Sequence, residues 1–526
     1  LGRRTAWMLL GAIVAMLSSV LFLYRSPNLV AIALRDATPE VLAHRSSAII
    51  RSLGVPVSGS AVSHFEFERE YYAWLDDRDR AATLHQLREG PGAILYRTQY
   101  GVEPRVVPDG RVEHGPGRTR IAVDGKGRLA ALSAGPTPQW KPSRLDWRKL
   151  HEAAGLDPAS IRSATPRLVP DVAFDTRMAW SARYPGVSTP LHVEAATWRG
   201  TPVFFRVTGP WERQAVPRAF GEGPVTILIT IVSLIVFGSG AALAWRNLRL
   251  RRGDRKGALR LAATVFLLSL VSSLLAADHR PDLREEIHVI TEHMAEACFW
   301  AAVMYLLYIA LEPYIRRRWP DTLIASTRLL AGNYRDPMVG RDILIGIAAG
   351  ATHSFLPNVP ELLNAMWGSQ PRLIRVGEEF QSLHGIRFAL ARIPAALASG
   401  IAQSFLWVVV LVLMAILLRK RLYGALGLFS VVAFAYVLAV PSPEVLPSAL
   451  LVGAILTFVA ARFGLLAFAV TQATFLMIFF SGAAVDGSWT TPLALIPAIF
   501  LLALAAFAFK TALGSQSAFS GSLLED

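Results

Sequence analysis

Apolar runs long enough to cross a lipid bilayer recur along this 526-residue chain and constrain its fold more than any other feature. A helix needs about 20 apolar residues to span the hydrocarbon core. Hydrophobic residues make up 53% of the sequence, and the mean hydropathy is +0.40. The chain is therefore predicted to be a mostly α-helical polytopic membrane protein with about ten transmembrane helices. The predicted spans are 7–24, 224–245, 261–277, 297–311, 343–357, 389–418, 423–440, 446–461, 465–480 and 493–509.

Basic residues indicate the orientation of these spans. Lys and Arg outnumber Asp and Glu, which gives a net charge of +14. They gather in short segments beside the apolar runs, as at 246–260, 316–318 and 419–421. Such segments remain on the cytoplasmic side, so both termini are predicted to be cytoplasmic in a multi-pass protein of the bacterial inner membrane. Topology and the lipid bilayer account for the positive charge, and nucleic acid is not a predicted partner.

One long segment contains no run that could cross the membrane. Residues 25–223 are predicted to form an extracytoplasmic α+β domain, inserted between an N-terminal transmembrane helix (1–24) and a polytopic membrane domain (224–510). Residues 511–526 are the predicted cytoplasmic tail. The only cysteine, Cys298, lies in a predicted span, so the inserted domain has no disulfide and must fold on its apolar core.

The inserted domain is predicted to contain two similar modules, each a helix followed by three strands. In the first, a helix at 38–53 precedes strand 93–100 and a hairpin at 120–133. In the second, a helix at 146–154 precedes strand 178–184 and a hairpin at 191–207. An aromatic stretch between them has two interpretations, a core helix, which is favoured, or the lining of a ligand pocket. It comprises Phe65, Phe67, Tyr71, Tyr72 and Trp74.

The basic segment 311–342 carries more than a topological signal. Asp321 is predicted to cap a short helix at 322–330 that lies along the inner membrane surface, with Tyr314 and Trp319 at headgroup depth. The favoured interpretation is a topogenic, lipid-binding loop. Its distinctive residues are Glu312, Pro313, Arg316, Arg317, Arg318, Trp319, Pro320, Arg328, Arg335, Asp336, Pro337, Gly340, Arg341 and Asp342.

Two stretches resemble a known family. They are LEPYIRRRWPDTLIASTRLLAGNYRDPMVGRDILIG and, after the first span, SPNLVAIALRDATPEVLAHRSSAIIRSLG. Both are similar to the C-terminal membrane regions of bacterial receptor-like serine/threonine protein kinases of the Acidobacteria type. The resemblance implies a membrane-embedded sensor for signal transduction, with a kinase domain ahead of Leu1 in the parent protein. A homodimer is one arrangement through which such a sensor acts.

Kinase chemistry is not predicted for this chain itself. It has neither a Gly-rich loop followed by a strand lysine nor an Asp-Phe-Gly triplet. No catalytic residue, cofactor-binding residue or cofactor is predicted, and whether the membrane domain is an enzyme stays open.

Two clusters of acidic and histidine residues are candidate metal sites. On a helix, Glu285, His288, Glu292 and Glu296 would lie near one face, where they could bind zinc. A solvated acidic loop at 278–296 is the favoured alternative. Glu378, Glu379 and His384 resemble elements of CAAX-protease-like intramembrane metal-dependent peptidases, although the arginine expected after the glutamates is absent. The metal candidates retained are Glu285, His288, Glu292 and His384.

Transport is the remaining alternative. The glycine-interrupted run 343–357 is predicted either to cross the membrane or to be re-entrant, and a re-entrant segment would be typical of a transporter. The few polar residues within spans, His353, Gln403 and Gln472, are expected to form hydrogen bonds between helices.

Overall fold

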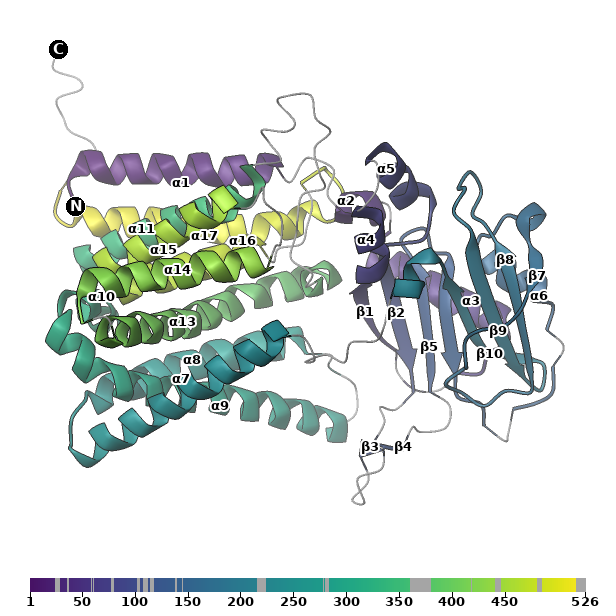
Figure 1. Cartoon of the computed structure of the whole chain (residues 1–526), viewed down its shortest axis with the longest axis horizontal. Helices are drawn as coiled ribbons and strands as arrows, with labels where there is room; N and C mark the ends of the chain where they lie inside the picture. The colour runs from purple at the N-terminus through teal and green to yellow at the C-terminus, as the bar shows by residue number, and fades with distance from the viewer. Residues whose placement is uncertain are drawn as a thin grey trace, which may run out of the picture.

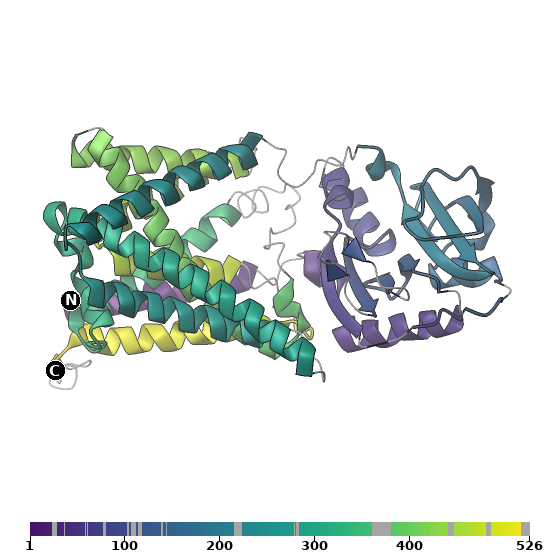
Figure 2. The same cartoon turned by 90° about the horizontal axis from the view of Figure 1, so that it is seen from below.

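A computed structural model describes most of the chain as a helical domain joined at one end to a sheet domain (Figures 1 and 2). The described residues are 1–23, 29–35, 37–57, 59, 61–76, 80–101, 105–106, 112–113, 118–137, 140–143, 145–214, 224–277, 279, 283–359, 380–417, 419–439, 446–479 and 485–516.

The helical domain consists of long, roughly parallel helices. They are α1 (Arg3–Leu23), α7 (Pro224–Arg249), α8 (Arg255–Ala276), α9 (Leu283–Arg318), α10 (Asp321–Leu330), α11 (Pro337–Phe355), α13 (Ile386–Leu417), α14 (Arg421–Ala439), α15 (Leu446–Arg462), α16 (Leu465–Phe479) and α17 (Thr491–Leu513), with the short turns η3 (Leu356–Asn358) and η4 (Gln381–His384). Each of the ten predicted spans overlaps one of these helices. The N-terminus and α10 lie at the end of the bundle away from the sheet domain (Figure 1).

Five helical segments within the described residues are long and apolar enough to cross a membrane. They are Arg3–Leu23, Arg255–Ala276, Glu286–Arg317, Ile386–Ala415 and Thr491–Leu513. The helices α14, α15 and α16 are apolar but shorter; α16 has 15 residues and reaches about 22 Å, less than the hydrocarbon thickness of about 30 Å. The structure therefore supports a mostly helical protein with a sheet domain, but it does not support ten spans.

The acidic segment 278–296 was wrongly predicted to be a loop. Most of it forms the first turns of α9, which continues without a break to Arg318. Strong helix formers such as Leu, Glu, Met and Ala fill this segment, and the first proline in the helix is Pro313. Pro313 has no N–H to donate to the Ile309 carbonyl. The Asn247 side chain of α7 donates to that carbonyl instead (2.9 Å) and to the next one, of Ala310 (3.2 Å).

In the segment 343–357, α11 is continuous through Phe355, so Gly346 and Gly350 do not interrupt the helix. Its glycines allow close helix packing instead. A Cβ at Gly346 would lie 2.6 Å from the Ala467 carbonyl oxygen, and one at Gly350 would lie 2.6 Å from that of Thr471. Both carbonyls belong to α16, so α11 and α16 meet backbone to backbone, as small residues permit in membrane proteins.

The sheet domain is built on eight antiparallel strands in the order β1-β2-β5-β6-β10-β9-β8-β7. Its elements are α2 (Leu29–Ala33), α3 (Pro39–Ser52), β1 (Ala61–Phe67), α4 (Arg69–Asp76), α5 (Arg80–Glu89), β2 (Ile94–Tyr100), β3 (Arg105–Val106), β4 (Val112–Glu113), β5 (Thr119–Asp124), β6 (Leu129–Ala134), α6 (Trp147–Ala153), η1 (Pro158–Ser160), β7 (Arg162–Ala164), β8 (Thr176–Ala182), β9 (Leu191–Trp198), β10 (Thr201–Thr208) and η2 (Pro210–Gln214). The strands β3 and β4 form a separate pair.

Two four-stranded meanders make up this sheet and join along β6 and β10. A helix precedes each meander, α3 before the first and α6 before the second. Thr38 and Asp146, the first residues of the two predicted helices, are the N-caps of α3 and α6. Each meander has four strands, whereas three were predicted. Phe65 and Phe67 lie in the missed strand β1 and not in a core helix, while Tyr71 and Trp74 are in helix α4.

One apolar core crosses the junction between the two domains. Phe380, Leu383, Ala389, Leu493 and Ala494 come from the helical domain, yet they belong to the same buried cluster as the sheet core. The Trp489 indole N–H, just before α17, donates to the Leu34 carbonyl just after α2 (2.9 Å). The sheet domain is therefore packed directly onto the ends of α13 and α17.

Candidate functional site

One face of the sheet carries a row of charged and small residues that sequence reasoning missed. Arg97 on β2 pairs with Ala122 on β5, Ala122 with Ala131 on β6, and Ala131 with Arg206 on β10. Side chains alternate between the faces of a strand, so these four residues project to the same side. Two arginines are thus separated by a floor of two alanines. Helix α3 covers the opposite face, where Ser47 Oγ forms a hydrogen bond with Tyr100 Oη (3.1 Å).

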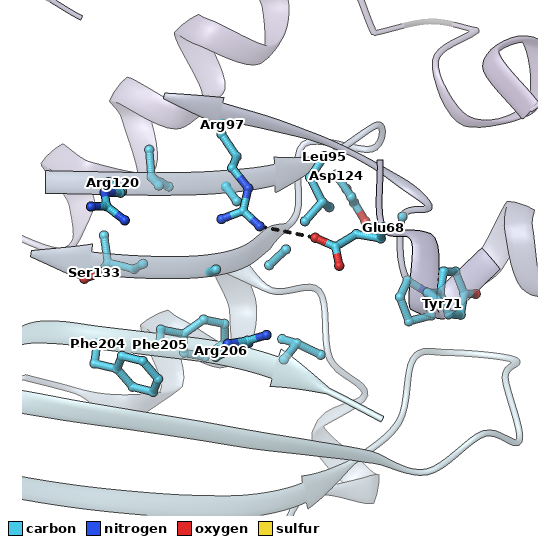
Figure 3. Close-up of a pocket in the computed structure, with 18 of the residues that line it drawn as sticks. Glu68, Tyr71, Leu95, Arg97, Arg120, Asp124, Ser133, Phe204, Phe205 and Arg206 are labelled. Atoms are coloured by element: carbon cyan, nitrogen blue, oxygen red, sulfur yellow. Dashed lines mark hydrogen bonds and ion pairs between the residues drawn. The ribbon is translucent and has the colours of Figure 1, made fainter. Parts of the chain in front are cut away.

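A cavity of about 420 Å³ lies over this floor. Figure 3 shows Arg97 and Arg120 side by side along one wall, with Arg206 on the opposite wall and Glu68 and Tyr71 at one end. This volume is within the range of small-molecule sites, about 300–1,000 Å³.

The arginines of the cavity are unequally paired. Arg97 forms ion pairs with Glu66 and with Glu68, the latter at 3.3 Å from Nη2 to Oε1. Arg206 Nη2 lies 2.7 Å from Glu212 Oε1. Arg120 makes no ion pair with any residue in the described part of the chain. Burial lowers the pKa of Arg97, and the nearby charges of Arg206 and Arg120 lower it further.

Carboxylates form the other half of the cavity's charge. Burial raises the pKa of both Glu68 and Glu212; Arg206 opposes this rise, and Glu70 adds to it in both. In each of these half-buried carboxylates the effect of burial on the pKa therefore exceeds that of the neighbouring arginine. Beside them, the rings of Tyr71 and Trp211 form an aromatic wall, with centroids 4.7 Å apart. Of the predicted aromatic stretch, only Tyr71 lines the cavity.

Strand β1 connects the cavity with the helical domain. His64 and Glu66 project to the cavity side, and His64 lines the cavity. The next residue, Phe65, donates its backbone N–H to His384 Nε2 in η4 (3.2 Å). Phe67 packs against Phe380, with ring centroids 6.1 Å apart. One strand thus contacts the cavity on one face and the start of α13 on the other.

The metal candidates are not brought together. His288 and Glu292 are exposed on α9, and the Glu285 side chain lies outside the described residues. His384 lies at the domain junction, where its ring contacts Phe65, Tyr96 and Phe388. Within the residues that the structure describes, no three His, Cys, Asp or Glu side chains form a group that could hold a metal ion. Glu378 and Glu379 also lie outside those residues.

The basic segment 311–342 is more buried than predicted. Trp319 is buried and does not project to the surface. Asp321 is the first residue of α10 and makes no side-chain cap. Among the described side chains, ion pairs within the segment join Glu312 with Arg316, Arg328 with Asp336, and Arg341 with the buried Asp342. Gly340 packs against α17, where a Cβ would lie 2.6 Å from the Ala512 nitrogen. The segment therefore contributes to the packing of the helical domain.

A second cavity, of about 300 Å³, lies among α8, α9 and α13. Ser269, Glu296 and Gln403 are among its lining residues. Gln403 Oε1 accepts a hydrogen bond from Gln472 Nε2 of α16 (3.2 Å), which is the contact between helices that the sequence predicts.

Comparison of the chain with protein-family models, curated proteins and solved structures gives no match.

Proposed function

We propose that the chain is the membrane-embedded sensor region of a receptor-like serine/threonine kinase. The observation that carries this proposal is the double contact of β1. Its cavity-facing side includes His64, and its other side binds His384 and Phe380 at the start of α13. A ligand that binds better to one position of β1 shifts the equilibrium between positions of α13. Helix α13 in turn packs against α8, α14 and α16, so its displacement reaches the centre of the helical domain.

The orientation proposed is sheet domain outside and basic helix ends inside the bacterial inner membrane, with about ten crossings. Cysteine labelling tests it. In a Cys298→Ser background, single cysteines are introduced by Arg51→Cys on α3 and Arg335→Cys after α10, both at exposed positions. A membrane-impermeant maleimide is expected to label the first variant in intact cells and the second only after permeabilisation. The reverse pattern would overturn the orientation.

The kinase assignment rests on the resemblance, and the DNA upstream of Leu1 tests it directly. An in-frame kinase domain is expected there. A stop codon immediately upstream would remove the kinase from the proposal. Given the kinase, deletion of 25–223 is expected to abolish its response to envelope cues.

Coupling through β1 has a finer test. His384→Ala removes the acceptor for the Phe65 N–H but changes no residue that lines the cavity. Ligand binding is therefore expected to persist, while autophosphorylation of the kinase no longer responds to the ligand. His44→Ala, at an exposed position on α3, is the matched control and is expected to respond normally. A normal response of His384→Ala would rule out this route.

Transport of a polar solute is the second candidate function, and the cavity among α8, α9 and α13 favours it. Glu296→Gln and Gln403→Leu would then abolish solute uptake, whereas the sensor proposal expects signalling to survive Glu296→Gln. Uptake by vesicles containing the purified protein decides between the two.

A further inference from the structure

The sheet cavity holds two opposed groups of charges side by side. Arg97, Arg120 and Arg206 form the basic group, and Glu68, Glu70 and Glu212 form the acidic group. The groups touch where Arg97 meets Glu68 and where Arg206 meets Glu212, at 3.3 and 2.7 Å. A ligand that fits both must therefore carry a negative and a positive group only a few ångströms apart.

Space for the anionic group exists between the arginines. Arg97 and Arg206 stand three strand spacings apart, about 14 Å, with only Ala122 and Ala131 between them. Arg120 lies on the same face, paired with Gln99, which is two residues from Arg97 on β2. Guanidinium groups bind carboxylates through paired hydrogen bonds. A carboxylate above the alanine floor is within reach of all three arginines.

The existing ion pairs do not fully offset the hydration that the basic and acidic groups lose in the cavity. Burial and two like-charged neighbours lower the pKa of Arg97, and burial raises those of Glu68 and Glu212. Partly buried ion pairs of this kind lose hydration that their mutual attraction does not fully restore. An added carboxylate stabilises the arginines, and an added ammonium stabilises the glutamates.

We infer that this cavity binds a free α-amino acid, with its carboxylate on Arg97, Arg120 and Arg206 and its ammonium on Glu68 and Glu212. The inference rests on the proposed sensor function and names its ligand class. In an α-amino acid the two charged groups share one carbon, which matches the contact between the basic and acidic groups. The aromatic wall of Tyr71 and Trp211 adjoins the glutamates, where it can contact the ammonium and the amino acid side chain.

The experiment uses the full chain purified in detergent. Each of the twenty standard amino acids is screened for a shift in thermal unfolding, and the best is titrated by calorimetry. Its N-acetyl and carboxamide derivatives, each lacking one charge, are expected to bind at least about tenfold more weakly, because each loses its charge-assisted hydrogen bonds to one of the two groups. Arg120→Gln and Glu212→Gln are each expected to weaken binding about tenfold.

Arg51→Gln is the matched control, because it removes the same charge from an exposed position on α3, which covers the other face of the sheet. Its affinity is expected to equal that of the unmodified chain. No stabilisation by any of the twenty amino acids would overturn the inference. Equal binding of the N-acetyl derivative would overturn it too, and would indicate a simple anion site.

These outcomes separate the ligand from the sensor function. If no amino acid binds while the His384→Ala response is lost as expected, the ligand class alone is wrong. If an amino acid binds but kinase output never changes, the site stands and the sensor function is wrong.

Discussion

The helical and sheet domains satisfy their buried polar groups in different ways. In the helical domain, hydroxyl groups donate to the carbonyl one turn back, as Ser354 does to Gly350, Ser404 to Gly400 and Thr471 to Ala467. In the sheet domain, buried side chains also bind partners in other elements of the fold. Gln86 donates to Thr189, and Glu194 accepts from the Arg167 and Leu168 backbone. The helical fold therefore depends on the close fit of its helices, and the sheet fold depends on particular polar pairs.

The largest loss of stability is expected on removal of a buried ion pair in the sheet domain. Asp124 accepts from the backbone N–H of Lys126 and Arg128 and from the Arg128 side chain (2.9, 2.9 and 2.7 Å). Arg128 in turn binds the Glu89 and Gly90 carbonyls at the end of α5. Asp124→Ala leaves that guanidinium without its carboxylate and is expected to cost about 3–5 kcal/mol. Thermal unfolding of the purified chain measures this loss.

Glu152→Ala is the control for Asp124→Ala, since Glu152 is an exposed carboxylate on α6. Its effect is expected to stay within about 0.5 kcal/mol. Equal effects of the two substitutions would mean that the sheet does not depend on its polar pairs, and the contrast between the domains would be lost.

The second expected loss of stability arises at the junction between the two domains and depends on pH. Burial lowers the pKa of His384 from 6.5 to about 4, and His64 contributes to this shift. The neutral ring accepts the Phe65 N–H. Between pH 6.5 and 4 the unfolded chain binds more protons than the folded chain, so stability is expected to fall as the pH falls through this window. The total loss is about 3 kcal/mol, and no further loss from this group is expected below pH 4.

His384→Phe isolates this contribution because it keeps an aromatic ring but cannot titrate. The stability difference between the unmodified chain and His384→Phe is expected to change between pH 6.5 and 4 and to be constant above pH 7.5. Unfolding temperatures measured across that range test the prediction. A constant difference at all pH values would contradict the buried, neutral state of His384.

The third effect tests close fit in the helical domain. Gly346→Ala places a methyl group 2.6 Å from the Ala467 carbonyl oxygen and from the Val470 Cβ. Overpacking of this kind is expected to cost about 2 kcal/mol. Gly11→Ala on α1 is the matched control, because a Cβ there meets no atom within 4 Å. It is expected to be neutral or slightly stabilising, since alanine favours helix. If Gly346→Ala left the free energy of unfolding unchanged, α11 and α16 could move apart without loss of stability.

This contrast explains which features the sequence could predict. Helix positions follow from runs of apolar residues, which are local, so a helix lies at each predicted span. The turns at Asp124 and Arg199 and the caps at Thr38 and Asp146 are local signals too. The meaning of Gly346 and Gly350 depends on the partner helix α16, so the same glycines also suggested a re-entrant segment.

The candidate site could not be predicted because strand order creates it. Arg97 and Arg206 come to line one cavity only when β6 pairs with β10, and neither residue stands out in the sequence. The alternation of Leu95, Arg97 and Gln99 with Tyr96, Thr98 and Tyr100 was the available signal, since it predicts a polar face on β2. Strand β1 was missed because its aromatic residues continue into α4 and imitate one helical stripe.

The smallest loss of stability is expected at a polar contact in the helical domain. This contact is an exception to the contrast between the domains, because its partners lie far apart in sequence. Asn247 is 3% exposed and donates to the Ile309 and Ala310 carbonyls. Asn247→Leu keeps the branching of the side chain at Cγ but removes both donors, and a loss of about 1 kcal/mol is expected from hydrogen bonds between membrane helices.

Pro313→Ala provides the decisive background for that substitution. Alanine restores an N–H at position 313, which can donate to the Ile309 carbonyl within α9. Asn247→Leu is then expected to cost less than in the unmodified chain, and a double-mutant cycle of unfolding free energies measures the difference. If both backgrounds lose the same amount, Asn247 does not compensate for the proline. A clear coupling would show that the helical domain uses a distant polar pair where a helix has lost its own hydrogen bond.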